Sequence, residues 1–328
     1  MPTDATLRSP RSTTSLPPSP FPTDDPILSQ IGSTPMIAYP GAEDGRLLCK
    51  LESENPTRSM KDRIAMGILT EALQEDDYHT VVEASSGNTA GGVALVANRL
   101  GITCKLTCPE GTSPDKIGYM KALGAEVHTC PDVDSDHPDH YRAAAQRLAD
   151  KDGAFLVDQY HNQSNPGVHY RWTGPEIWAQ AGAEMTHLVS AMGTGGLLSG
   201  SARHVKEQAK KEGRGVTVVG VDADRSNIST AFYDEEPVPY ETTVEGLGKG
   251  GDLPTMWFDY IDEMRDVPDE TAYQQARTSA QEHGMPIGPS AGAALSVALE
   301  IHAAHPDARV VTIVCDGGEQ YFDTLFDV

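Results

Sequence analysis

The chain has 328 residues, of which 38% are hydrophobic, so it is long enough for two globular domains or one large domain. Its 48 acidic and 25 basic residues give a formal net charge of −23, which argues against nucleic acid or an anionic membrane surface as a partner. No apolar run approaches the length of a membrane span.

The N-terminal stretch, residues 1–26, is rich in Pro, Ser and Thr and poor in apolar residues, so it is predicted to be a disordered tail. It lacks the apolar centre of a secretory signal. The acidic residues are spread along the whole chain rather than gathered in one tail. We take this spread as the basis for a hypothesis of a halophilic host, with an acidic mesophilic enzyme as the alternative.

Five cysteines stand at spacings that fit neither a disulfide framework nor a zinc site. Cys104 and Cys108 fall on one face of a predicted strand, so buried thiols in a reducing cytoplasm are expected and no metal is predicted. The acidic run Asp132 to Asp136 begins like a calcium loop, but His137 occupies the glycine position, so a solvated loop is expected instead.

Strand and helix patterns alternate along the rest of the chain, which predicts parallel sheets with crossover helices. The first series has strands at 47–51, 80–84, 102–108, 126–130 and 155–157, with helices from Lys61 and at 87–100, 113–123 and 141–150. The second has strands at 186–191, 216–221 and 309–314, with helices at 197–211, 270–283 and 291–304. We expect two α/β domains, with a ligand cleft beyond the carboxyl ends of the strands.

Lys61 is predicted to lie in the first turn of an amphipathic helix, for which Ser59 and Asp62 form a capping-box pattern. The positive end of the helix dipole and the nearby Arg63 both disfavour a second positive charge there, which makes the amine a candidate nucleophile. A solvated lysine at a helix start is the plainer interpretation of this stretch alone.

Three strand-to-helix junctions carry small hydrogen-bonding residues. The junction at 85–89, Ser-Ser-Gly-Asn-Thr, suits a carboxylate at a helix N-terminus. The junction at 193–196, Gly-Thr-Gly-Gly, suits a compact phosphate group, since it matches neither the dinucleotide nor the nucleoside triphosphate pattern. In the third, Ser290 precedes a helix of small residues. An amine, a phosphate cup, an asparagine loop and a placed serine together describe a site for pyridoxal phosphate.

From about Ile31 to the C-terminus, the sequence resembles the cysteine synthase and cystathionine β-synthase family, the fold-type II pyridoxal phosphate enzymes. The motifs that carry the resemblance are Ser59 to Arg63, Ser85 to Thr89, Lys121 to Ala125, Asp158 to Tyr160, Asn165-Pro166, Thr173 to Ile177, Gly193 to Gly196, Glu245 to Gly248 and Ser290 to Gly292. Leu197, Pro289 and the segment Cys315 to Tyr321 depart from the usual pattern, but none of these departures removes a catalytic group.

The resemblance implies a two-domain α/β fold similar to the tryptophan synthase β chain, in which each domain is an open, largely parallel sheet covered by helices. Residues 27–50 and 160–328 would form the large cofactor-binding domain, and residues 51–159 a smaller mobile domain. The family also implies a homodimer, and the cysteine usage described above favours a cytoplasmic location.

The resemblance further implies a role for each residue of the site. Lys61 would form the Schiff base and move the α-proton, Asn88 would contact the ring oxygen of the cofactor, and Ser290 the pyridine nitrogen. The phosphate would bind to Gly193, Thr194, Gly195 and Gly196. The amino-acid substrate would bind to Ser85, Ser86, Gly87, Asn88, Thr89, Gln159 and Gly246.

The expected reaction is β-replacement on an activated serine, with cysteine synthesis from O-acetylserine and sulfide favoured. Cystathionine synthesis from serine or O-acetylserine and homocysteine is the alternative. A serine or threonine dehydratase and a non-catalytic binding protein of the same family are less favoured. Glu245 stands where some relatives that use O-phosphoserine carry an arginine, which argues against that substrate.

Overall fold

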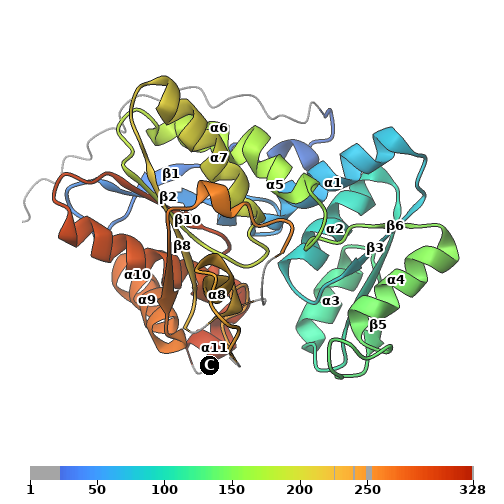
Figure 1. Ribbon diagram of the computed structural model, residues 1–328. Coiled ribbons are helices and arrows are strands. Elements are labelled where there is room, and N and C mark those ends of the chain that lie inside the picture. Colours follow the sequence, from blue (N-terminus) through green and yellow to red (C-terminus); the bar gives the residue numbers. More distant parts are fainter. Residues whose placement is uncertain (1–22, 225, 239–240, 249–252, 327–328) are drawn as a thin grey trace, which may run out of the picture.

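The computed structural model describes residues 23–224, 226–238, 241–248 and 253–326, and within them the chain forms two separate sheets covered by helices (Figure 1). The predicted tail therefore lies almost entirely outside the described residues. The larger sheet has six strands in the order β1 (Met36–Ala38), β2 (Leu47–Leu51), β10 (Val310–Val314), β7 (His187–Ala191), β8 (Thr217–Ala223) and β9 (Glu263–Val267). Only β1 pairs antiparallel with its neighbour.

The smaller sheet has four strands, all parallel, in the order β5 (Glu126–Cys130), β4 (Thr103–Pro109), β3 (Thr80–Ala84) and β6 (Phe155–Leu156). Its helices are α1 (Lys61–Glu75), α2 (Asn88–Leu100), α3 (Pro114–Ala122) and α4 (Tyr141–Asp152). The larger sheet is accompanied by α5 (Ser164–Val168), a π-helical turn (His169–Thr173), α6 (Gly174–Ala181), α7 (Gly196–Lys211), α8 (Asn227–Phe232), α9 (Asp269–His283), α10 (Pro289–Ala304) and α11 (Phe322–Leu325).

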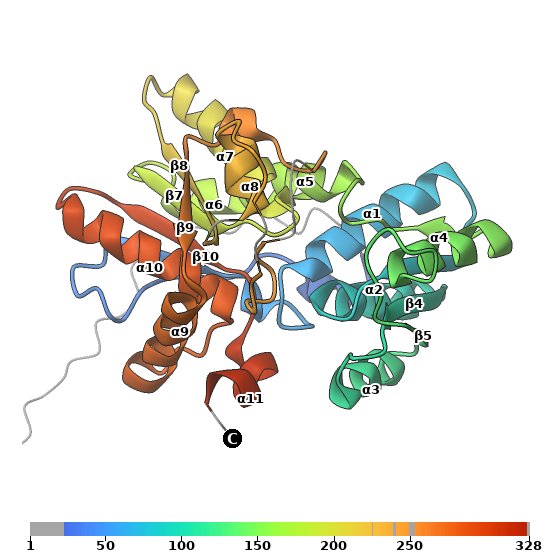
Figure 2. The same ribbon diagram turned by 60° about the horizontal axis from the view of Figure 1, so that its bottom comes forward.

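The burial of the strands is consistent with two separate, largely parallel sheets that are each covered by helices. All five residues of β10 are buried, as expected for a strand covered by helices on both faces. Two extensive apolar clusters follow the two sheets: one includes Leu47, Val189, Val219 and Ile313, and the other includes Leu106. Figure 2 shows the two sheets and their helices lying apart, with α1 and α5 at the junction between them. We propose that these sheets are the centres of the two domains with the boundaries predicted above.

The predicted alternation is confirmed, and the strands at 80–84 and 126–130 match residue for residue. Most other predicted elements begin or end within a few residues of the observed ones. The strands and α-helices that were not predicted are β1, β9, α8, α11 and the helical run from α5 to α6. The α/β fold expected from the resemblance is confirmed.

The carboxyl ends of the parallel strands meet where the two sheets face each other, and the loops that follow them begin helices. Residues 85–87 connect β3 to α2, and residues 192–195 connect β7 to α7. The chain after β10 passes the same place, because Met60 N donates to the carbonyl oxygen of Cys315 (2.9 Å). Three distant stretches of sequence therefore meet in one region.

Candidate active site

Lys61 is the first residue of α1, as predicted, but the predicted capping box is wrong. Met60 occupies the N-cap position, and the backbone N–H of Lys61 donates to Ser59 Oγ (3.2 Å). Asp62 turns away from Ser59 and accepts from the backbone N–H of Thr57 (2.7 Å) and from its hydroxyl. Burial raises the pKa of Asp62 to about 7. The aspartate therefore closes the preceding loop onto the helix instead of capping it.

A buried cluster of four charges fixes the start of this helix. Arg63 donates to Glu52 Oε2 (2.6 Å) and to Glu176 Oε1 (2.7 Å), and Lys50 donates to Glu176 Oε2 (2.7 Å). All four side chains are at most 2% exposed. Burial opposes ionisation of Glu52, but the Arg63 guanidinium holds the pKa of that carboxyl at about 2. The two cations balance the two anions, so α1 is tied to β2 and α6 two residues after Lys61.

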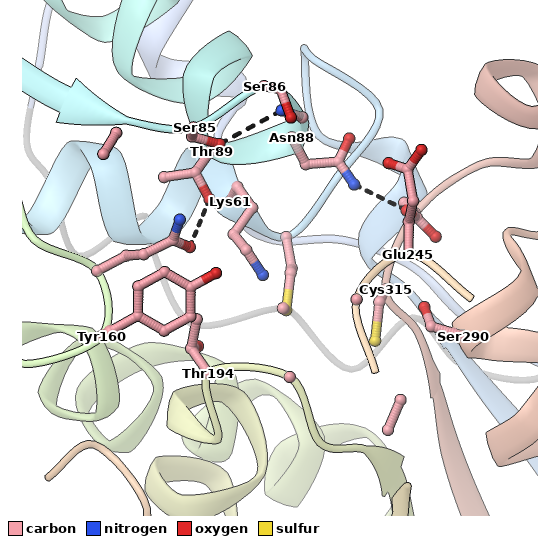
Figure 3. Close-up of a pocket in the computed structure, with 18 of the residues that line it drawn as sticks. Lys61, Ser85, Ser86, Asn88, Thr89, Tyr160, Thr194, Glu245, Ser290 and Cys315 are labelled. Carbon is pink, nitrogen blue, oxygen red and sulfur yellow. Dashed lines mark hydrogen bonds between the residues drawn. The ribbon is translucent and has the colours of Figure 1, made fainter. Parts of the chain in front are cut away.

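Lys61 projects into a cavity of about 340 Å³ between the two sheets (Figure 3). This volume is within the range of small-molecule sites. The cavity brings together the predicted residues Lys61, Ser85, Ser86, Gly87, Asn88, Thr89, Gln159, Gly193, Thr194, Gly246 and Ser290. Nine more residues complete the lining: Met60, Ala84, Tyr141, Tyr160, Ala191, Glu245, Cys315, Asp316 and Tyr321.

The asparagine loop begins α2 and is held by side chains at its start. The Ser85 hydroxyl accepts from the backbone N–H of Gly87 (3.3 Å), and Gly87 is the N-cap residue of α2. Thr89 donates its hydroxyl hydrogen to Gln159 Oε1 (2.6 Å), and Gln159 in turn donates to Glu83 Oε1 (3.2 Å). The first N–H groups of α2 lack partners within the helix, so this loop can bind a carboxylate.

The glycine loop begins α7, a 16-residue helix, in the same way. Gly193 and Thr194 line the cavity, but Gly195 and Gly196 do not. Gly195 adopts a left-handed conformation (φ 79°) as the N-cap residue. A Cβ on Gly196 would lie 2.0 Å from Asn165 Oδ1, so a side chain is excluded there by the neighbouring asparagine. The cavity therefore contacts the first half of the predicted phosphate cup, while the second half shapes the turn.

Ser290 lies at the start of α10, opposite the asparagine loop, as Figure 3 shows. A Cβ on Gly246 would lie 3.6 Å from its hydroxyl oxygen, so the backbone of Gly246 passes close to Ser290. Sequence reasoning gave no role to Asp316, Tyr321 or Tyr160, although Tyr160 lies in a motif of the family resemblance and the other two lie in the segment that departs from it. Asp316 stands two residues after the buried strand β10, and this position was the signal that could have found it.

The donor set of the cavity suits pyridoxal phosphate. Lys61 supplies an amine that can react with the aldehyde, the start of α7 supplies backbone N–H groups for the phosphate, and Ser290 supplies a neutral hydroxyl for the ring nitrogen. The buried Asn88 Oδ1 has no hydrogen-bond partner among the described residues, as expected of an atom that faces a ligand site. No group of three or more metal-ligating side chains occurs among the described residues. None of the described helices is long and apolar enough to cross a membrane.

Comparison with known proteins agrees with this geometry. A family model described as "Pyridoxal-phosphate dependent enzyme" matches residues 27–316. Cysteine synthase B of Escherichia coli K12 is 34% identical over 300 residues, which cover 90% of this chain and 93% of that protein. The crystal structure of O-ureido-L-serine synthase superposes with a TM-score of 0.83 at 28% identity, covering 92% of this chain and 94% of that one. O-acetyl serine sulfhydrylase isoform 3 from Entamoeba histolytica gives a TM-score of 0.82 at 26% identity, covering 99% and 95%.

Proposed function

The chain belongs to the pyridoxal-phosphate dependent enzymes, and from this membership we propose that it makes cysteine from O-acetylserine and sulfide, with release of acetate. The observation that carries the proposal is the convergence of Lys61, the asparagine loop, the glycine loop and Ser290 on one cavity. Two of the relatives described above are named cysteine synthase B and O-acetyl serine sulfhydrylase, which supports the same reaction class.

Pyridoxal phosphate, when bound, withdraws electrons from the α-carbon of an amino acid, so that the α-proton becomes acidic and an activated group can leave the β-carbon. In the proposed mechanism, Lys61 Nζ holds the cofactor, removes the α-proton and later returns it. Acetate leaves with its bonding electron pair, and sulfide forms the new bond to the β-carbon. The buried charge cluster around Arg63 keeps the Lys61 backbone in place during these steps.

The substrate carboxylate is proposed to bind at the start of α2, where Ser85, Ser86 and Thr89 supply hydroxyls beside the helix N-terminus. Gln159 is already held in position by Thr89 and Glu83, so its amide is preorganised. Asn88 is proposed to contact the ring oxygen, Gly193 and Thr194 the phosphate, and Ser290 the ring nitrogen. Gly195 and Gly196 are proposed to act through the shape of the turn.

Acetate is favoured over phosphate as the leaving group because the Glu245 carboxylate lines the cavity. The phosphate group of a bound O-phosphoserine would place a second anion beside this carboxylate and would be repelled. Lys116, whose Nζ pairs with Glu245 Oε1 at 2.5 Å, reduces this repulsion. Among the described residues that line the cavity, no feature favours homocysteine over sulfide, so cystathionine synthesis is not advanced as a second function.

The remaining expectations stay proposals. Five free, buried cysteines are consistent with a reducing cytoplasm. A halophilic host is supported by the net charge of −23 and fails if the protein keeps its fold and activity in dilute buffer. A homodimer is tested by light scattering at the working salt concentration.

The test of the function is product analysis. Purified holoenzyme is incubated with O-acetylserine and sulfide, and in parallel with O-acetylserine and homocysteine, with Lys61→Ala as the inactive control. Cysteine and acetate in equal amounts support the proposal. Cystathionine formed faster than cysteine, or pyruvate formed without any thiol, would replace it.

A further inference from the structure

Asp316 occupies a junction between the helices that carry the proposed cofactor contacts. It follows β10, and its backbone forms an isolated bridge with Ser59, two residues before Lys61. The backbone N–H of Gly288, two residues before Ser290, donates to the carbonyl oxygen of Asp316 (3.2 Å). One peptide segment is thus shared by the start of α1 and the start of α10.

The side chain of Asp316 extends the junction to the third helix. Its Oδ2 accepts from Asn88 Nδ2 (2.7 Å) at the start of α2 and from the Tyr321 hydroxyl (2.6 Å). The residue is 3% exposed, and its Oδ1 has no hydrogen-bond partner among the described residues. A Cβ on Gly288 would lie only 2.0 Å from this Oδ1, so the loop before α10 is shaped around the carboxylate.

The carboxylate decides which way the Asn88 amide faces. An amide side chain has a donor nitrogen and an acceptor oxygen of nearly the same shape, so its orientation depends on its partners. The bond marked in Figure 3 places the nitrogen of Asn88 toward Asp316. One of the two N–H groups is used in this bond, which leaves the second N–H and the unpartnered Oδ1 for other contacts.

We propose that Asp316 is a positioning residue whose carboxylate orients the Asn88 amide for its contact with the cofactor, while its backbone contacts to the starts of α1 and α10 remain when the side chain is replaced. This inference rests on the proposed role of Asn88 at the ring oxygen. Burial raises the pKa of Asp316 to about 6, so the carboxylate is still mainly ionised at pH 7.5 and accepts charge-assisted hydrogen bonds.

A double-mutant cycle on cofactor binding tests the inference. The variants are Asn88→Ala, Asp316→Ala and the double variant, and the measurements are the dissociation constant of pyridoxal phosphate for the apoenzyme and the wavelength of the bound cofactor's visible band. Each single variant is expected to bind the cofactor roughly ten- to a hundredfold more weakly, as for a hydrogen bond to a charged group. Because Asp316 acts through Asn88, the double variant is expected to bind as weakly as Asn88→Ala alone, with the same visible band.

Effects that multiply in the double variant would overturn the inference, since Asp316 would then act independently of Asn88. Normal cofactor binding by Asn88→Ala would instead refute the proposed role of Asn88, so the two failures are distinguishable.

Tyr321→Phe is the matched control, because it removes the other donor to the same carboxylate and leaves the Asn88 bond in place. It is expected to change cofactor affinity by less than about threefold, because the bond that is lost does not involve the Asn88 amide. A loss as large as that of Asp316→Ala would mean a general structural role and would overturn the inference. If Asp316→Ala does not fold, as judged by circular dichroism, the same cycle with Asp316→Asn decides, because that variant preserves the shape and removes the charge.

Discussion

Glu83 offers a sharp test of how burial controls charge beneath the site. It lies on β3 with its side chain 1% exposed, and its Oε1 accepts from Gln159 while its Oε2 has no partner among the described residues. Burial raises its pKa from the ordinary 4.5 to about 8, with the nearby charge of Asp158 acting in the same direction. The carboxyl is therefore mainly protonated at neutral pH in the folded chain.

The consequence for stability follows from proton linkage. Below pH 4.5 the group is protonated in both states, and between 4.5 and about 8 only the unfolded chain releases the proton. The free energy of unfolding therefore falls as the pH rises through this window and levels off above it. The difference between 4.5 and about 8, at about 1.36 kcal/mol for each pH unit, sets this loss at about 5 kcal/mol.

Glu83→Gln removes the titration and keeps the shape. The new amide nitrogen has no acceptor where Oε2 lay, which costs about 1–3 kcal/mol at every pH. We expect the variant to be less stable than wild type at pH 5 and more stable at pH 9, when unfolding by urea is followed at constant salt. The exposed Glu75→Gln is the control and should give a constant difference. A stability difference between Glu83→Gln and wild type that stays the same from pH 5 to pH 9 would refute the reasoning.

Three further predictions concern the charges around the site. Arg63→Ala leaves buried carboxylates without their cation, so it should lower the free energy of unfolding, measured in urea, by about 3–5 kcal/mol, and Arg63→Lys should lower it by less. An Arg63→Ala variant as stable as wild type would show that the cluster does not stabilise the fold. Lys61→Ala should lower kcat by about a thousandfold or more and leave no cofactor attached to the chain after borohydride reduction; attachment elsewhere would reject the assignment. Reversing the charge of Lys116 or of Glu245 breaks their ion pair beside the cavity, so it should raise KM about two- to fivefold at the lowest salt concentration that keeps the protein folded; the double reversal should restore KM, with no effect expected at 1 M salt.

The sequence predicted much of the fold because hydrophobic periodicity and glycine stops are local signals. The helix predicted at 87–100 is observed as α2 (Asn88–Leu100), and it ends at Gly101, which adopts the left-handed conformation (φ 72°) that terminates a helix. The short edge strand β1 and the helical run through the π-helical turn at His169 carry no such local period, and long-range packing decides them.

The site was predictable to the extent that its residues stand in strand-to-helix loops. Lys61, Asn88 and Ser290 each begin a helix, and a helix start is visible in the sequence. The capping-box prediction failed because Asp62 finds better donors in Thr57, a contact that spacing alone cannot indicate. Asp316 was missed for the same reason, since its importance depends on the distant partner Asn88.

The central claim is that Lys61 holds pyridoxal phosphate and performs cysteine synthesis, and one spectroscopic titration tests it most directly. The visible spectrum of the purified protein is recorded in concentrated salt, first alone, then with O-acetylserine, and finally with sulfide. The account predicts a cofactor band that shifts when O-acetylserine is added and returns to its starting position when sulfide is added. A protein that stays colourless after incubation with the cofactor, or a band that does not respond to O-acetylserine, would contradict it.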